Sequence, residues 1–171
     1  MQNYGIEEDD RDGEEREDIK CFKRIHLLHG NAGISGAEAQ PVLSLLSLNG
    51  SFDHKIISVP FYPHTLYIGR QFNAKTVPTP VNGFFDSKVV SRRHAEVWAD
   101  ANGKIRIRDV KSSNGTYVNR MRLSPENRES EPHDLRPQDH LELGSDIVSE
   151  DQTTVIHHKV VAKVEHAGLI T

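Results

Sequence analysis

The sequence predicts an all-β fold, either a sandwich or a barrel. Short apolar or alternating segments recur between residues 41 and 164, and glycine, asparagine or proline interrupts them roughly every dozen residues. The pair Asn102-Gly103 lies between two such segments, which is a strong signal for a β-hairpin. Helix is therefore expected to be a minor component.

The strands are expected in the following order. The first covers residues 42–48, where apolar residues lead to the turn pair Asn49-Gly50. Later strands are expected at 65–68, 95–98, 104–110, 117–118, 141–143 and 153–164. Within 104–110, the apolar residues Ile105, Ile107 and Val110 alternate with a polar set, which is Arg106, Arg108 and Asp109. Two long connections, residues 71–88 and 124–138, are rich in proline and are expected to be mobile or functional.

Charge and composition divide the chain into a tail and a body. Residues 1–20 hold nine acidic and three basic residues, a net charge of −6, while the remaining 151 residues carry +2. Such an acidic, apolar-poor segment cannot bury enough surface to fold alone. We therefore expect a disordered acidic tail at 1–20, a poorly defined segment at 21–40, one folded domain at 41–166, and a C-terminal end at 167–171.

The same numbers exclude several classes of protein. Hydrophobic residues make up 36% and charged residues 27% of the chain, which is typical of a globular protein. No apolar run approaches the roughly 20 residues of a membrane span, and the acidic N-terminus is not a secretory signal. The single cysteine, Cys21, can form no internal disulfide, so an intracellular location is expected. A net charge of +2 on the body is too small for a nucleic-acid binder.

Three polar clusters between residues 69 and 116 are rich in hydrogen-bond donors. The donors suit an anion, and the best candidate is a phosphate on a partner peptide; they are Arg70, Ser91, Arg92, Ser113 and Asn114. Gly69, Gly115 and Thr116 lie in the same turns, and His94 is expected to brace a loop by hydrogen bonding. Each cluster also has a simpler interpretation: a solvated strand-end arginine at Arg70, an import or solubility patch at Arg92-Arg93, and an ordinary hairpin turn at Asn114-Gly115.

Catalytic and metal sites are not expected. No nucleophile, base and acid stand together near the three clusters, so the protein is not expected to be an enzyme. Ten histidines include the pairs His26/His29 and His157/His158, but neither pair has a third ligand at a diagnostic spacing. We therefore expect neither a metal nor a cofactor.

Taken in order, the clusters resemble a known family. Gly69-Arg70, then Ser-Arg-Arg-His-Ala at 91–95, then Asp-Val-Lys-Ser-Ser-Asn-Gly-Thr-Tyr-Val-Asn at 109–119, resemble the forkhead-associated (FHA) domain over residues 41–164. The similarity is greatest to the sarcolemmal-membrane-associated-protein group and its fungal factor-arrest and vacuole-targeting relatives. Fungal FHA-RING ubiquitin ligases are similar over the same stretch.

The resemblance implies a fold, a ligand and a set of roles. The fold is a twisted sandwich of about eleven strands with FHA topology, with the binding loops at one end. The ligand is a phosphothreonine peptide. Arg70 and Ser91 would hold phosphate oxygens, and Arg92 would contact phosphate or peptide. Ser113, where the family often has threonine, would contact the phosphothreonine methyl group and phosphate. Asn114 would bond the peptide backbone on the C-terminal side.

The resemblance also implies partners and a place in the cell. The partner would be a phosphothreonine-containing protein, for example a kinase or a member of a striatin-type phosphatase-kinase assembly. The protein would act in the cytoplasm or on the cytoplasmic face of an internal membrane, with any membrane anchor outside this chain. Two alternatives stay open: an FHA-fold scaffold that binds partners through a phosphate-independent surface, and the FHA part of a RING-type ubiquitin ligase.

Overall fold

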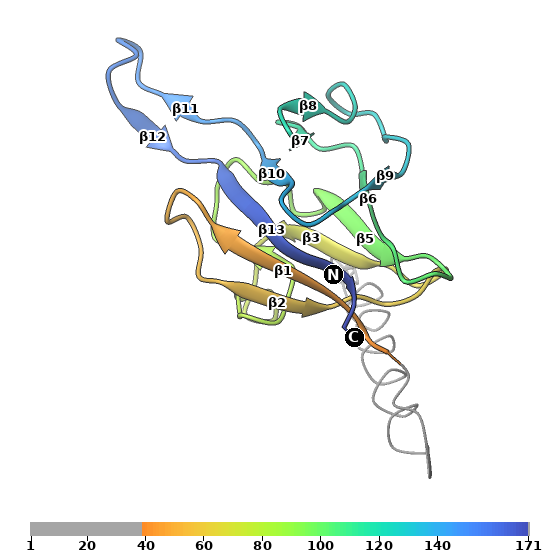
Figure 1. The fold of residues 1–171 in the computed structure, drawn as a ribbon. Coiled ribbons are helices and arrows are strands. Elements are labelled where there is room, and N and C mark those ends of the chain that lie inside the picture. The colour runs from red at the N-terminus through yellow and green to blue at the C-terminus, as the bar shows by residue number, and fades with distance from the viewer. Residues whose placement is uncertain (1–38, 171) are drawn as a thin grey trace, which may run out of the picture. The chain divides into compact units, whose positions relative to one another are not determined.

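The computed structural model describes residues 39–170, which form two larger sheets and one ribbon (Figure 1). The first sheet has the strand order β2 (Lys55–Ser58), β1 (Pro41–Ser47), β13 (Val160–Leu169), β10 (His140–Leu143), β7 (Thr116–Val118) and β8 (Met121–Arg122). The second has the order β4 (Phe84–Phe85), β3 (Leu66–Arg70), β5 (Ala95–Ala99), β6 (Ile105–Asp109) and β9 (His133–Asp134). The ribbon consists of β11 (Ile147–Val148) and β12 (Val155–His157).

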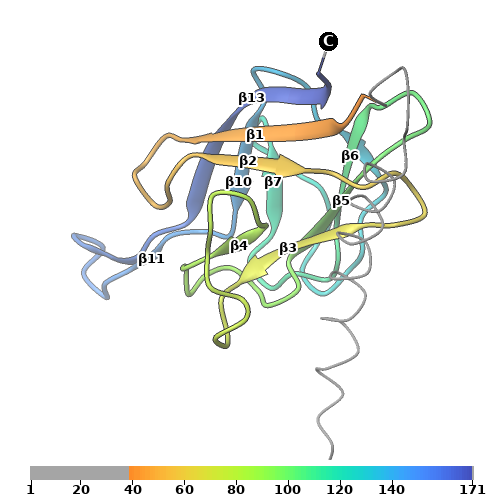
Figure 2. The ribbon, with the colours of Figure 1, turned by 90° about the horizontal axis from the view of Figure 1, so that it is seen from below.

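Figure 2 shows the two larger sheets from below, and buried residues of both sheets form one hydrophobic core. All named strand pairs are antiparallel except β3 with β4. Strand β6 shows the expected alternation, because its first, third and fifth residues are buried and the two arginines between them are partly exposed. Strand β1 is buried along its first five residues. The predicted all-β sandwich is therefore confirmed, with thirteen strands in the described residues rather than about eleven.

The predicted strand at 153–164 is wrong as a single element. The structure divides it into β12 and β13, with His158 and Lys159 between them. The Lys159 N–H donates to the Asp146 carboxylate at 2.8 Å, and the His158 carbonyl accepts the Ser87 hydroxyl at 2.9 Å. These bonds hold the chain where it passes from the ribbon into the sheet. Apolar character alone could not reveal that break.

The long connection at 71–88 is held in place by polar contacts and includes β4. Buried Thr76 accepts the Phe72 N–H at 2.8 Å, which closes a local turn. Buried Lys55 on β2 donates from Nζ to the Thr79 carbonyl at 2.6 Å, and the Ile56 N–H donates to the Pro80 carbonyl at 2.8 Å. The connection is therefore held in a defined conformation and belongs to the folded domain. The other long connection, 124–138, contains β9.

The strand ladders bring the three polar clusters to one end of the sandwich. Strand β3 ends at Arg70, and the His94 N–H, just before β5, donates to the Ile68 carbonyl at 2.9 Å. The connection after β6 leads into β7, whose Thr116 pairs with Leu143 at the end of β10. Within residues 39–170 there is no helix long and apolar enough to cross a membrane. The predictions for residues 1–38 fall outside the described residues.

Candidate functional site

The end of β3 and the loop before β5 approach each other closely. The Arg70 N–H donates to the Ser91 carbonyl at 3.0 Å. A Cβ atom on Gly69 would lie 1.8 Å from the Arg92 carbonyl oxygen, a distance that no side chain tolerates. Glycine at position 69 is therefore required for the strand and loop to touch. This contact sets Arg70 beside Ser91 and Arg92.

The Ser91 side chain makes one of the contacts between the loop before β5 and the loop that carries Ser113. The Ser91 hydroxyl accepts the Ser113 N–H at 3.2 Å. Because this bond uses a lone pair of the oxygen, the hydroxyl proton stays free, and it meets no acceptor among residues 39–170. Ser113 itself is exposed. The two serines therefore lie side by side at the surface, with donors available to a ligand.

Asn114 is already anchored within the protein. Its side-chain N–H donates to the Val89 carbonyl at 2.9 Å, and its backbone carbonyl accepts the Ser145 hydroxyl at 3.3 Å. An amide side chain has two N–H donors and one acceptor oxygen, so one donor and the oxygen remain. The free N–H donor and the free oxygen complement the carbonyl and the N–H of a peptide backbone unit. The anchor at Val89 was not foreseen from the sequence.

The buried side chain of His94 links the loop that carries Ser91 to the loop that carries Ser113 and Gly115. It is fully buried, its Nδ1 accepts the Ser91 N–H at 3.0 Å, and its Nε2 lies 2.8 Å from the Gly115 carbonyl. A carbonyl can only accept, so Nε2 carries the proton and the ring is neutral. Burial lowers the pKa of His94 below its ordinary value, the main cause being desolvation, which the bond to Gly115 partly opposes. The ring therefore acts as a neutral cross-link between the two loops.

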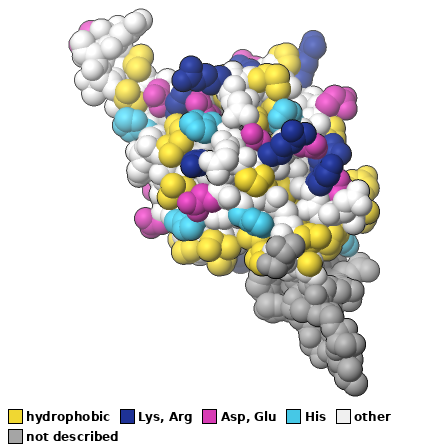
Figure 3. Space-filling model, viewed as in Figure 1, with side chains coloured by type: hydrophobic (Ala, Val, Ile, Leu, Met, Phe, Trp, Pro, Cys, Tyr) yellow, Lys and Arg dark blue, Asp and Glu magenta, His cyan; other side chains and the backbone are white. Residues whose placement is uncertain are grey.

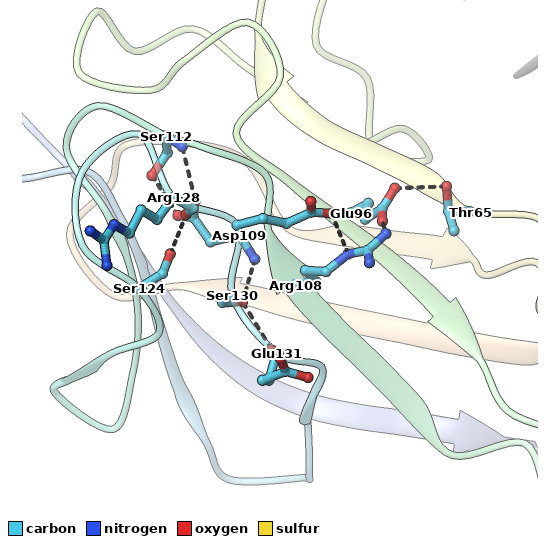
Figure 4. A network of polar contacts seen from close by, with 10 residues as sticks. Thr65, Glu96, Arg108, Asp109, Ser112, Ser124, Arg128, Ser130 and Glu131 are labelled. Carbon is cyan, nitrogen blue, oxygen red and sulfur yellow. Dashed lines mark hydrogen bonds and ion pairs between the residues drawn. The ribbon is translucent and has the colours of Figure 1, made fainter.

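A buried carboxylate organises the loop that carries Ser113 and Asn114 (Figure 4). Asp109, at the end of β6, accepts the Ser112 N–H at 2.9 Å, the Ser112 hydroxyl, and the Thr116 hydroxyl at 2.8 Å. The Asp109 N–H in turn donates to the Ser130 hydroxyl at 2.9 Å. Together these bonds fix both ends of the turn between β6 and β7.

Sequence reasoning placed Asp109 on the polar side of its strand, and this assignment is wrong. The strand period of two puts Asp109 on the same face as Ile105 and Ile107, and only 1% of the residue is exposed. A signal was present, because an Asp at a strand end can accept hydrogen bonds from the backbone and hydroxyl groups of the turn that follows. The extra residue Val110 lies past the strand.

Arg70 and Arg92 differ from Arg108 in their partners. Arg108 pairs with Glu96, which also accepts the Thr65 hydroxyl at 3.0 Å (Figure 4). By contrast, no carboxylate among residues 39–170 pairs with Arg70 or Arg92. Exposed Arg92 lies over the Phe72 ring, 5.4 Å from its centroid. Two arginines without a carboxylate partner, on the contacting segments at the end of β3 and before β5, favour an incoming anion.

The structure thus brings together residues from all three predicted clusters. Ser91 contacts the backbone of Arg70 and Ser113, and His94 and Gly115 lie directly beneath. The described residues contain no group of three His, Cys, Asp or Glu side chains that could hold a metal ion. His26 and His29 lie outside the described residues. Asp109, Phe72 and the Val89 carbonyl are the contributors that sequence reasoning missed.

Comparison with known proteins gives a family match and several relatives. Residues 66–144 match the family model of the FHA domain. The chain is 50% identical over 125 residues to an uncharacterized protein of Schizosaccharomyces pombe, covering 72% of this chain and 40% of that protein. It is 37% identical over 144 residues to vacuolar protein sorting-associated protein 64 of Saccharomyces cerevisiae, covering 75% and 22%. It is 39% identical over 115 residues to human sarcolemmal membrane-associated protein, covering 63% and 14%.

The coverage of these relatives limits what they show about this chain. The chain spans at most 40% of the length of these relatives, so their full activities do not transfer to it. Among solved structures, the kinase-interacting FHA domain of the kinase associated protein phosphatase of Arabidopsis has a TM-score of 0.51 at 20% identity, covering 78% of this chain and 99% of that domain. That similarity supports the fold.

Proposed function

We propose that this protein binds partners in a phosphothreonine-dependent manner, because it contains a forkhead-associated domain, matched by the family model over residues 66–144 and generally a phosphopeptide-binding interaction module. The partner would be a phosphothreonine-containing protein of kinase and phosphatase signalling, such as a kinase or a member of a striatin-type phosphatase-kinase assembly. Binding would take place in the cytoplasm or on the cytoplasmic face of an internal membrane, where such phosphorylation occurs.

One observation supports this proposal: hydrogen bonds join Arg70, Ser91 and Ser113, and no carboxylate among residues 39–170 pairs with Arg70 or Arg92. The Ser91 hydroxyl is fixed by the Ser113 N–H, and Arg70 adjoins Ser91 through its backbone. A phosphate carries about −1.5 to −2 charges at pH 7 and three strong acceptor oxygens. Such a dianion can accept from the Ser91 hydroxyl and from the planar fork of Arg70 at once. A single planar carboxylate would satisfy fewer of these donors.

The expected affinity is moderate. A hydrogen bond to a charged group contributes roughly 1.5–3 kcal/mol, so three or four give about 5–12 kcal/mol before the ordering of the peptide is subtracted. A micromolar complex, which corresponds to about 8 kcal/mol, fits this range. Removing the phosphate would remove most of the attraction, so binding would follow the phosphorylation state of the partner.

The geometry around the serines favours binding over catalysis. A general base for Ser91 would have to face its hydroxyl, but His94 Nδ1 accepts the Ser91 backbone N–H instead. The other ring nitrogen is used by the Gly115 carbonyl. FHA domains are interaction modules, and nothing in this arrangement activates a nucleophile.

A phosphothreonine peptide library tests the proposal. The domain should bind selected phosphothreonine peptides, and Arg70→Ala should weaken binding by about 10- to 100-fold, the effect of losing one or two charge-assisted hydrogen bonds. Ser91→Ala should also weaken it. Arg136→Ala is the matched control, because that arginine is highly exposed and lies in the connection before β10, away from the clusters.

Three results would contradict the proposal. The first is equal binding by the parent and Arg70→Ala, and the second is equal binding of phosphorylated and unphosphorylated peptides. The third is a partner that stays bound after phosphatase treatment, which would favour the phosphate-independent scaffold. Replacing phosphothreonine by phosphoserine in the best peptide measures how much the methyl group contributes beside Ser113.

A further inference from the structure

The ribbon of β11 and β12 projects away from the two larger sheets (Figure 1). Its two strands pair only with each other in the described part of the chain, Ile147 with His157 and Val148 with Val155. Each strand therefore keeps one edge of backbone donors and acceptors without a strand partner. Such an edge is a template for a further strand.

The ribbon carries large aliphatic side chains that are not buried. Ile147, Val148 and Ile156 are 44%, 43% and 54% exposed. The space-filling view shows hydrophobic surface on the projecting arm, below its tip (Figure 3). An isolated two-stranded ribbon is marginally stable in water, and a third strand or a cover on one face stabilises it. The ribbon therefore has the composition of a surface that is completed by binding.

The base of the ribbon is nevertheless anchored, and its tip turn is ordered by hydrogen bonds. At the base, the Lys159 N–H donates to Asp146 at 2.8 Å, and its ammonium pairs with Glu142 at 2.8 Å. At the tip, Asp151 accepts the Thr153 hydroxyl at 2.8 Å. A ribbon with an anchored base and an ordered tip turn loses little conformational freedom when a partner binds.

The ribbon begins at the edge of the phosphopeptide site. The Ser145 hydroxyl donates to the Asn114 carbonyl at 3.3 Å, and the Gly144 N–H donates to the Gly115 carbonyl at 2.8 Å. Ile147 follows Ser145 by two residues, which is about 7 Å along a strand. A peptide that passes over Asn114 toward Ser145 therefore meets the ribbon next.

We propose that the β11–β12 ribbon is a second docking surface for the same phosphorylated partner. It binds an extended apolar segment that follows the phosphothreonine on its C-terminal side, beyond the residues that contact Asn114. The segment lies along a free ribbon edge, and its side chains, which alternate between the two faces, extend the exposed aliphatic surface formed by Ile147, Val148 and Ile156. The tip residues Glu150 and Asp151 favour a basic residue at the far end of that segment. This inference rests on the proposed function.

The test extends the best peptide from the library screen. One version is lengthened at its C-terminus by an alternating valine-threonine stretch ending in lysine, and a second by a glycine-serine stretch of equal length. A third carries the valine-threonine stretch at its N-terminus. Affinities are measured by fluorescence anisotropy with the parent, Ile156→Thr, Val148→Thr and Arg70→Ala. Ile56→Thr on β2 is the matched control, because Ile56 is 53% exposed on a different surface.

The C-terminal apolar extension should raise the parent's affinity by about tenfold over the glycine-serine version, since a tethered second contact adds to the first. Ile156→Thr and Val148→Thr should lose this gain while binding the unextended peptide normally, and Ile56→Thr should keep it. Arg70→Ala should weaken every phosphopeptide.

Other outcomes overturn the inference in distinguishable ways. If the unextended peptide binds but the extension adds nothing, or the gain survives both ribbon variants, the ribbon proposal is wrong and the phosphopeptide site stands. If no phosphopeptide binds, both proposals are wrong. If sedimentation shows a dimer that Ile156→Thr dissociates, a second copy of the chain occupies the ribbon instead.

Discussion

His94 shows how one residue can set the geometry of a site without touching a ligand. Its ring joins the Ser91 N–H to the Gly115 carbonyl, and these two groups belong to loops that are far apart in the sequence. Adding a proton to Nδ1 would turn an acceptor into a donor and set it against the Ser91 N–H. The link therefore depends on the ring staying neutral.

This dependence predicts a loss of stability in acid. The pKa of His94 is lowered in the folded state, so below about pH 6.5 the unfolded chain binds a proton that the folded chain does not. The free energy of unfolding should therefore fall as the pH drops through that value. The advantage of the parent over His94→Gln should shrink by about 1 kcal/mol between pH 7.5 and 5.5 in urea unfolding.

The exposed His158 supplies the comparison for that experiment, because its side chain is solvated in the folded domain. His158→Gln keeps the buried His94 link, so it should retain the loss of stability in acid that His94→Gln lacks. A constant difference between the parent and His94→Gln would show that the buried ring titrates like an ordinary histidine.

At the scale of elements, one lysine holds a long connection against the sheets. Lys55 on β2 is 2% exposed, donates to the Thr79 carbonyl and lies 4.9 Å from the centroid of the Phe85 ring. Burial lowers the pKa of its ammonium to about 8, which the nearby Asp53 only partly opposes. The connection at 71–88 thus depends on a cation that is costly to bury.

A rise in stability with pH follows. The folded pKa lies below the unfolded value of 10.5, so between pH 8 and 10.5 the unfolded chain holds more protons and stability increases with pH. Relative to Lys55→Met, which lacks the titrating group, the parent should gain on the order of 2 kcal/mol between pH 7.5 and 9.5. Denaturant unfolding measures this, and a gain of equal size in both proteins would exclude Lys55 as its source.

The sequence predicted the longer strands and the three clusters, but not the parts that depend on distant contacts. Strands β1, β5, β6 and β10 have the periodicity or apolar character of buried strands, and turn residues mark their ends. Strands β4, β8 and β9 have two residues each, so they exist through their neighbours and carry no pattern of their own. At the site, the donors were visible as residue types, whereas the burial of Asp109 and the anchor of Asn114 on Val89 arise only from folding.

At the scale of the whole molecule, the first and last strands close the domain. Strand β13 pairs with β1 as far as Pro41 opposite Leu169, beyond the boundary at 166 expected from the sequence. Leu169 also packs against Gly103, where an added Cβ would lie 2.4 Å from its side chain. The last residues of β13 therefore belong to the fold.

We expect fragment 39–171 to fold alone, since it forms one compact unit. It should bind the same phosphopeptides as the full chain. Fragment 39–166 should melt several degrees lower, because it lacks the partners of Pro41, Val42 and Leu43, a loss on the order of 1–3 kcal/mol. Thermal unfolding by circular dichroism measures both fragments, and identical melting temperatures would show that residues 167–171 contribute nothing.

The pairing of Pro41 with Leu169 also means that the chain enters and leaves the domain at neighbouring positions. These positions lie at the opposite end of β13 from Val160, which pairs with Leu143 near the loop that carries Ser113 and Asn114, a separation of about 30 Å. A short bridge could join the two ends, and new ends could be opened in the β1–β2 turn at Gly50, giving a circular permutant with an unaltered recognition surface. The domain is thus suited to insertion within another polypeptide, displayed on a single stalk.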